Sequence, residues 1–206
     1  MYKSLLTKKF FRDNPLDEFS TQRFVYSILS YNGIEELADE FVSEYVDLGA
    51  ERHERIRSER ERIKSEQNPD ELFNFLRKDF ELNNRVYLIK RVLDFEEELM
   101  PKVTEKLKRS GNDHFIDNAI RLLARSEKNY SLLLLEKYSE IRRPYVQSLV
   151  CLILGFRGDE EIIPWMMNQY QEMKRLYPDE TYNQGPLLAL HELSHRFYEK
   201  DNHFHK

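Results

Sequence analysis

The chain has 206 residues, of which 40% are hydrophobic and 33% charged, and its formal net charge is −5. This length is enough to bury a core, whereas six glycines and seven prolines are few for a turn-rich all-β protein. The negative charge argues against a broad nucleic-acid-binding face, which needs a basic surface, but it leaves a local basic groove open.

A single cysteine, Cys151, lies in the apolar run LVCLIL. One cysteine cannot form a disulfide within the chain, which favours a reducing compartment. The first residues, MYKSLLTKKFFRDNP, contain no apolar core of signal-peptide length, and LVCLIL is too short to span a bilayer. These features predict a cytoplasmic protein without a membrane segment, in which Cys151 is a buried small hydrophobic residue.

Helical periodicity begins with residues 22–48. Apolar residues recur at spacings of three and four within 24–29 and again within 37–48. Asn32-Gly33 lies between these two stripes and predicts a turn that ends the first helix. The segment is therefore predicted to be a helical hairpin.

Three further hairpins are predicted, at residues 51–82, 84–111 and 114–141. The second hairpin opens with the charged stretch ERHERIRSERERIK, in which Glu and Arg alternate at spacings that pair along an exposed helix. Only Ile56 and Ile63 offer apolar anchors there. A solvated helix is predicted, with an arm that contacts a partner as the alternative.

The fifth predicted hairpin, residues 147–173, repeats the first. Laid over residues 22–48 without gaps, it is identical at eight positions, including Gly33/Gly158 at the turn. Four intervals of roughly 31 residues separate the two copies, which is within the range of stacked helical repeats. In EELMPKV of the third hairpin and EEIIPWM of the fifth, a proline after acidic residues predicts a helix start. Residues 185–201 would form the first helix of an incomplete sixth unit.

The segment VQSLVCLILGFRGDEEIIPWMMNQY resembles a HEAT-type repeat. Such repeats have an apolar first helix, a Gly-Asp turn, acidic residues, an aliphatic pair and a proline that opens the second helix. Gly158, Asp159, Ile162, Ile163 and Pro164 stand at these places.

The resemblance covers residues 146–173 well and residues 85–109 in part. It implies an all-α fold, an α-solenoid (α-α superhelix) of about five HEAT-like hairpins in a single domain, residues 1–206. Within that domain the charged helix 51–66 is a candidate for exposure and the tail 199–206 for disorder.

HEAT-like proteins are mostly non-catalytic and bind proteins, nucleic acids or cofactors along a groove. The resemblance therefore implies a scaffold or adaptor that binds another protein. Trp165, Met166 and Tyr170 are the candidate anchors, because aromatic and Met side chains anchor many interfaces. The alternative for these residues is packing in the core between repeats.

Basic residues near neighbouring turns are a second candidate surface. Arg121, Arg125 and Arg157 would meet an acidic partner, with scattered surface arginines as the alternative. A nucleic-acid-binding HEAT-like protein is an alternative function, and it would need a basic concave groove with an aromatic residue and a carboxylate at its centre. No cofactor is expected, since the sequence contains no Gly-rich phosphate-binding loop.

The stretch HELSH, residues 191–195, has the pattern of zinc proteases. His191 and His195 are four apart on one helix face and could hold a zinc ion, while Glu192 would activate a bound water as a base. The downstream glutamate ligand of such proteases is missing. A capping helix with an apolar stripe from Leu187 to Phe197 is therefore the preferred interpretation, and a zinc-dependent hydrolase stays as an alternative function.

Overall fold

The structure is a computed structural model that describes residues 2–28, 49–80 and 84–199. Every regular element among these residues is a helix, which confirms the all-α prediction. The chain divides into two compact units, which we describe one at a time. Unit 1 comprises Met1–Ile28 and Asn129–Lys206, and unit 2 comprises Leu29–Lys128.

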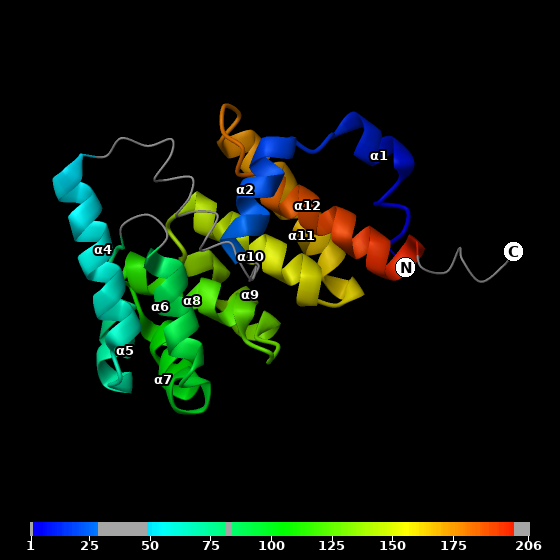
Figure 1. Ribbon diagram of the computed structural model, residues 1–206. Helices are drawn as coiled ribbons and strands as arrows, with labels where there is room; N and C mark the ends of the chain where they lie inside the picture. The colour runs from blue at the N-terminus through cyan, green and yellow to red at the C-terminus, as the bar shows by residue number, and fades with distance from the viewer. Residues whose placement is uncertain (1, 29–48, 81–83, 200–206) are drawn as a thin grey trace, which may run out of the picture. The chain divides into compact units, whose positions relative to one another are not determined.

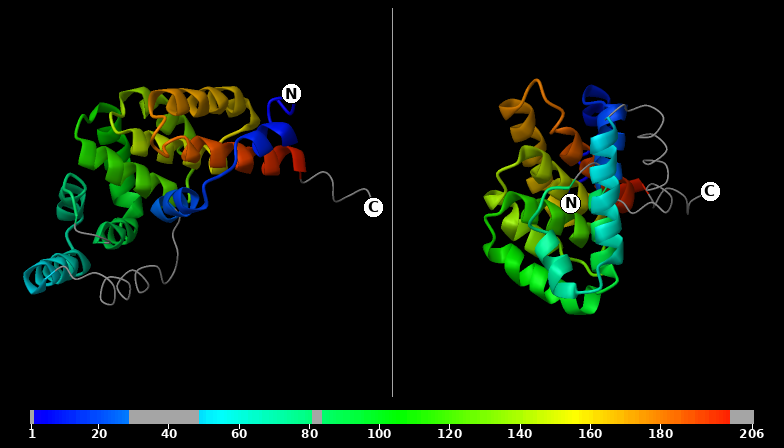
Figure 2. Two further views of the ribbon diagram at one scale, coloured as in Figure 1. Left: turned by 90° about the horizontal axis from the view of Figure 1, so that it is seen from above. Right: turned by 60° about the vertical axis from the view of Figure 1, so that its left-hand side comes forward.

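Unit 2 is built from helices that stack on their alternate neighbours. In the described part of this unit these are α4 (Ala50–Ser65), α5 (Pro69–Phe75), α6 (Asn84–Leu93), α7 (Glu96–Arg109) and α8 (Asp113–Arg125). Helix α4 packs on α6 and α6 on α8, while α5 packs on α7 (Figures 1 and 2). Each helix contributes fully buried apolar side chains to the core, among them Ile63, Leu72, Leu88, Leu99 and Leu122. Burial of this apolar surface is the main force that holds the helices together.

Local sequence explains where two of these helices begin. The Asn68 side chain accepts a hydrogen bond from the Asp70 backbone N–H at 3.0 Å, and Pro69 occupies the first helical turn of α5. The Asn112 side chain caps α8 in the same way. The prediction that Pro101 opens a helix is wrong, because α7 begins at Glu96 and Pro101 lies inside it.

The charged helix α4 lies on α6 through its two isoleucines. Ile56 and Ile63 are 5% and 1% exposed, whereas most charged side chains of α4 face solvent. Asn84, fully buried at the start of α6, donates from Nδ2 to the Ile56 carbonyl at 3.0 Å and to Glu59 Oε2 at 2.7 Å. Two apolar anchors and one buried amide therefore fix a helix whose other faces are hydrated.

Unit 1 is formed by two stretches of the chain. Its described elements are α1 (Lys8–Asp13), α2 (Glu18–Ile28), α9 (Ser131–Lys137), η1 (Tyr138–Glu140), α10 (Pro144–Arg157), η2 (Glu160–Ile162), α11 (Ile163–Leu176), α12 (Gln184–Ser194) and the π-helical turn η3 (His195–Glu199). Helix α12 packs chiefly on α10 and also on α11, and α2 contacts both α10 and α12 (Figure 1).

Small residues let α10 and α12 approach closely. A Cβ atom on Gly155 would lie 2.5 Å from Ala189 Cα, and one on Gly185 would lie 2.0 Å from Ser148 Oγ. The Ser148 hydroxyl also donates to the Tyr182 carbonyl at 2.6 Å, just before α12 begins. This helix pair is therefore the most tightly fitted part of unit 1.

The predicted fifth hairpin corresponds to α10, η2 and α11, with Pro164 in the first turn of α11. The predicted third hairpin corresponds to α6 and α7. The helices of the predicted fourth, α8 and α9, belong to different units. The second half of the predicted first hairpin lies outside the described residues, so the duplication and the solenoid stay predictions.

Candidate functional site

The three predicted arginines are divided between the two units. Arg121 and Arg125 belong to unit 2 and Arg157 to unit 1. The Arg121 side chain is only 10% exposed, and its Nε lies 2.7 Å from Asp117 Oδ1, four residues earlier on α8. Arg121 therefore lies in a buried ion pair rather than on an open basic surface, because a guanidinium this buried needs a carboxylate partner.

Met166 and Tyr170, two of the three predicted anchors, are buried. Met166 is 0% exposed and Tyr170 is 4% exposed. Met166 is part of the core of unit 1, and the Tyr170 hydroxyl donates to Asn14 Oδ1 at 2.6 Å. These positions follow the alternative of core packing, because a side chain without exposed surface cannot touch a partner while the unit stays closed.

Trp165, the third predicted anchor, remains partly exposed. Its ring packs edge-on against Tyr138 of η1, with ring centroids 4.8 Å apart and an interplanar angle of 79°. Tyr177 and Tyr182 form a second edge-on pair beyond the end of α11, at 5.3 Å. All four rings are only partly buried. We call these four tyrosine and tryptophan residues the aromatic patch.

A carboxylate lies next to the aromatic patch. Glu172 is two helical turns from Trp165 on the same side of α11 and its side chain is 50% exposed. Burial raises the pKa of the Tyr138 phenol, and Cys151, Glu172 and Tyr177 raise it further. The patch thus combines partly exposed aromatic residues with a negative charge, a combination suited to a cationic side chain.

Cys151 contacts Tyr138 of this patch and has an unreactive thiol. It is fully buried, and its Sγ is 3.9 Å from the Tyr138 hydroxyl oxygen. Burial raises the pKa of the thiol to about 12, against the weaker opposing effect of the Tyr138 hydrogen bond. A thiol in this state is not a nucleophile near neutral pH.

The HELSH histidines have separate surroundings. The His191 ring packs against Phe11 of α1, with centroids 4.0 Å apart, and its Nε2 is buried without a hydrogen-bond partner. His195 is 59% exposed, and its Nδ1 lies 3.5 Å from Glu199 Oε2. In the described part of the chain, no group of three or more His, Cys, Asp or Glu side chains could hold a metal ion. The acidic and histidine residues that follow HELSH near the end of the sequence, Asp201, His203 and His205, lie outside the described residues.

His191 gives the fold a pH dependence. Burial lowers the pKa of its imidazole below 6.5, and the Glu199 carboxylate only partly opposes this. Because the unfolded chain then takes up the proton first, the free energy of unfolding falls as the pH drops below about 6.5. Urea denaturation between about pH 7.5 and 5.5 should show this loss, and His191→Gln should reduce it. His195→Gln, which changes an exposed histidine, is the control and should keep the wild-type slope.

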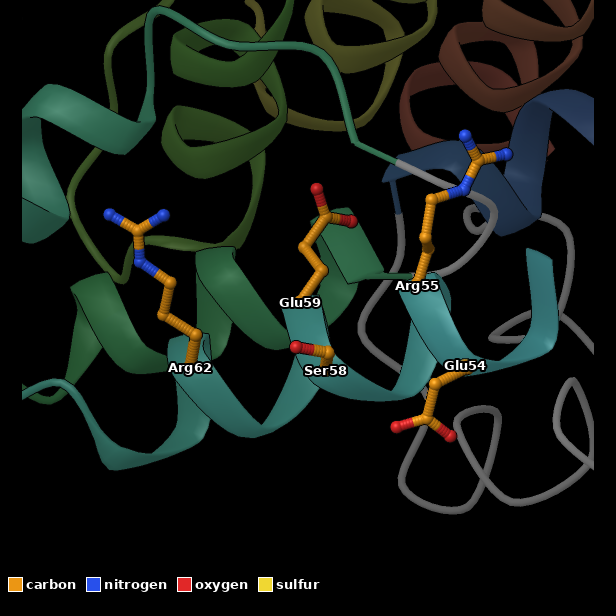
Figure 3. Close-up of a pocket in the computed structure, with 5 residues that line it drawn as sticks. All are labelled: Glu54, Arg55, Ser58, Glu59 and Arg62. Carbon is orange, nitrogen blue, oxygen red and sulfur yellow. The ribbon is translucent and has the colours of Figure 1, made fainter. Parts of the chain in front are cut away.

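The charged helix carries a shallow hollow of about 450 Å³ lined by Glu54, Arg55, Ser58, Glu59 and Arg62. Figure 3 shows Arg55, Glu59 and Arg62 projecting from the same side of α4. Acidic and basic groups alternate around the hollow, and Glu59 is engaged by Asn84. This mixture has no single charge sign to select a ligand, so the hollow belongs to the hydrated face predicted for this helix.

The sequence matches no protein-family model, and comparison with curated proteins and with solved structures gave no match. Among the described helices, none is both long enough and apolar enough to cross a lipid bilayer.

Sequence reasoning missed Tyr138 and the N-terminal aromatic residues Phe10 and Phe11, which pack against Tyr170 and His191. Tyr138 lies in a short 3₁₀ turn with no periodicity to mark it. The pair Phe10-Phe11 lies between charged residues in KKFFRD. Two adjacent aromatic residues in a charged segment were the only sequence feature that could indicate packing there. The buried Asp117–Arg121 pair had a clearer signature, because the two charges are four apart in the mostly apolar stretch FIDNAIRLL.

Proposed function

We propose that the protein is a non-catalytic interaction module of the HEAT-like helical-repeat type and that it binds another protein. The stacking within each unit supports this proposal. In unit 2, α4 packs on α6, α6 on α8 and α5 on α7, and in unit 1 α10 packs on α12. Contact between alternate helices is what stacked helical hairpins produce.

The aromatic patch is the observation on which the choice of site rests. Trp165 and Tyr138 pack edge-on against each other and both stay partly exposed to solvent. Partly exposed Trp and Tyr side chains supply large, rigid contact surfaces and are enriched among the residues that dominate binding energy. Leu176, 52% exposed at the end of α11, extends the apolar surface.

The charge beside the patch favours a basic partner. Glu172 lies at its edge and the whole chain carries a net charge of −5. An Arg or Lys side chain over the Trp165 ring would gain a cation–π contact of about 0.5–2 kcal/mol, together with attraction to the carboxylate. The partner segment is therefore expected to combine a basic residue with apolar neighbours.

Trp165 makes the test direct, because it is the only tryptophan in the chain. Its intrinsic fluorescence should change saturably when a short Arg- and Leu-containing peptide is titrated in, and not with a matched Glu- and Leu-containing peptide. Glu172→Arg should lower the affinity for the basic peptide by about fivefold or more, since it replaces attraction by repulsion. Glu71→Arg, an equal change of charge on an exposed residue of α5, is the control and should have little effect. Equal responses to the two peptides, or an unchanged affinity in Glu172→Arg, would refute the proposal.

A further inference from the structure

Helix α1 is seated on α11 and α12 through a small set of specific contacts. Phe10 packs edge-on against Tyr170, with centroids 5.8 Å apart, and Phe11 packs against His191 at 4.0 Å. After the helix, Asn14 Oδ1 accepts from the Tyr170 hydroxyl at 2.6 Å and from Lys174 Nζ at 3.1 Å. The predicted anchor Tyr170 is thus engaged by the chain's own N-terminal segment.

Helix α1 depends on this seat for its stability. It has six residues, none of them buried, and its only side-chain cap is Thr7, which accepts from the Phe10 N–H at 3.1 Å. Isolated helices of this length are not stable in water, because nucleation is unfavourable. Removal from α11 and α12 is therefore expected to unfold α1.

The segment that follows α1 is fixed independently. The Asp17 N–H donates to Gln184 Oε1 at 2.8 Å, and Phe24 is 1% exposed with its ring stacked on Tyr145 at 5.0 Å. Only Pro15 and Leu16 lie between Asn14 and this anchored part of the chain. Helix α1 could therefore leave α11 and α12 while α2 stays in place, provided that Leu6, which lies just before it and is 6% exposed, is released as well.

The hydrogen bonds at Asn14 are better suited to a different group. Two donors, one of them a lysine ammonium, converge on a single neutral amide oxygen. A carboxylate in this position would form charge-assisted hydrogen bonds, which are stronger than those to an amide. The surface formed by Tyr170 and Lys174 therefore binds Asn14, but it would bind a carboxylate at the same position more strongly.

We propose that Tyr170, Lys174 and His191 form a helix-binding site for a partner protein and that α1 is its weak internal occupant. The partner would present a short helix with two adjacent aromatic side chains and an acidic residue at the position of Asn14. Its carboxylate would meet Lys174 and Tyr170, and its aromatic pair would replace Phe10 and Phe11. Helix α1 would hold the site closed until such a segment competes with it.

The test uses the full chain and a labelled peptide of residues 7–15 that carries Asn14→Asp. The tethered α1 competes at a millimolar effective concentration, so the variant Phe10→Ala/Phe11→Ala, whose site is vacated, should bind the peptide at least ~10-fold more tightly than the wild type. Adding Lys174→Ala should weaken that binding, whereas Arg175→Ala, a neighbouring exposed charge, should not. A peptide with both phenylalanines replaced by alanine should not bind. Equal binding to the wild type and the vacated variant, or none to the latter, would overturn the proposal.

Hydrogen exchange on the wild type provides a second measurement that needs no substitution. If α1 detaches on its own, its amides should exchange at least ~100-fold faster than those in the middle of α12, since local opening precedes global unfolding. If the amides of α1 were protected from exchange as strongly as those of α12, α1 would be an integral part of the unit. The proposal that it is a displaceable occupant would then be wrong. A wild-type dimer that the peptide dissociates would instead identify α1 of a second copy as the occupant, which would contradict the partner named above.

Discussion

Gly155→Ala is expected to lower the free energy of unfolding by about 2 kcal/mol. The new Cβ would lie 2.5 Å from Ala189 Cα and 2.6 Å from Ala189 Cβ, so α10 and α12 would have to separate. Overpacking of this kind costs roughly 3 kcal/mol when backbone must move. The better helix propensity of alanine returns about 1 kcal/mol. The steric effect therefore dominates, and chemical denaturation should show a lower midpoint with an unchanged m-value.

Two further variants separate this explanation from a general sensitivity to glycine replacement. Gly111→Ala places a Cβ where no atom lies within 4 Å, and its stability should stay within ~0.5 kcal/mol of the wild type. Combining Gly155→Ala with Ala189→Gly removes the Cβ contact but leaves the contact with the Ala189 backbone. Partial rescue is therefore expected. A Gly155→Ala protein as stable as the wild type would contradict the close approach of the two helices.

For α10, the sequence predicts that the helix is buried but not which residues it contacts. The apolar run LVCLIL, residues 149–154, predicts a buried helix, and α10 is one. That run cannot reveal which residue meets Gly155, because Ala189 is 34 positions later and the pairing depends on how α12 is placed. Periodicity thus fixes the inward face of a helix, while the contact partner belongs to tertiary packing.

Helix α4 was predicted well because its pattern is extreme. Only Ile56 and Ile63 are apolar among fourteen mostly charged residues, and seven residues place them on the same face. No other face could be buried without desolvating many charges. The structure accordingly buries these two side chains and leaves most of the charged ones in water.

Helix α11 shows the opposite case. Its sequence is apolar over more than one stripe, so Trp165, Met166 and Tyr170 could not be sorted into inward and outward faces. The structure places Met166 in the core and Tyr170 under α1, and it leaves Trp165 partly exposed. Short segments such as α1 carry too few residues for periodicity to indicate where they dock.

Asp117→Ala is expected to lower the free energy of unfolding by about 3 kcal/mol. The Asp117 carboxylate is 5% exposed and lies 2.7 Å from Arg121 Nε and 3.4 Å from Arg85 Nη1. Its removal takes away the charge that these two poorly exposed guanidinium groups face. Asp70→Ala breaks an exposed pair with Lys102 at 2.9 Å and should cost less than ~1 kcal/mol. Urea denaturation of the two variants measures the difference.

The electrostatic explanation also predicts which second substitution should restore the stability lost in Asp117→Ala. If the damage comes from a buried positive charge without its carboxylate, neutralising both partners should be far milder than removing one. Asp117→Leu combined with Arg121→Met keeps apolar volume in the helix interface and should regain most of the ~3 kcal/mol, because paired buried charges and well-packed apolar residues have similar net stabilities. Arg85 retains its contact with Asp79 at 3.2 Å in that variant. A double variant no more stable than Asp117→Ala would mean that Asp117 matters for its shape or its other hydrogen bonds, and the electrostatic explanation would be wrong.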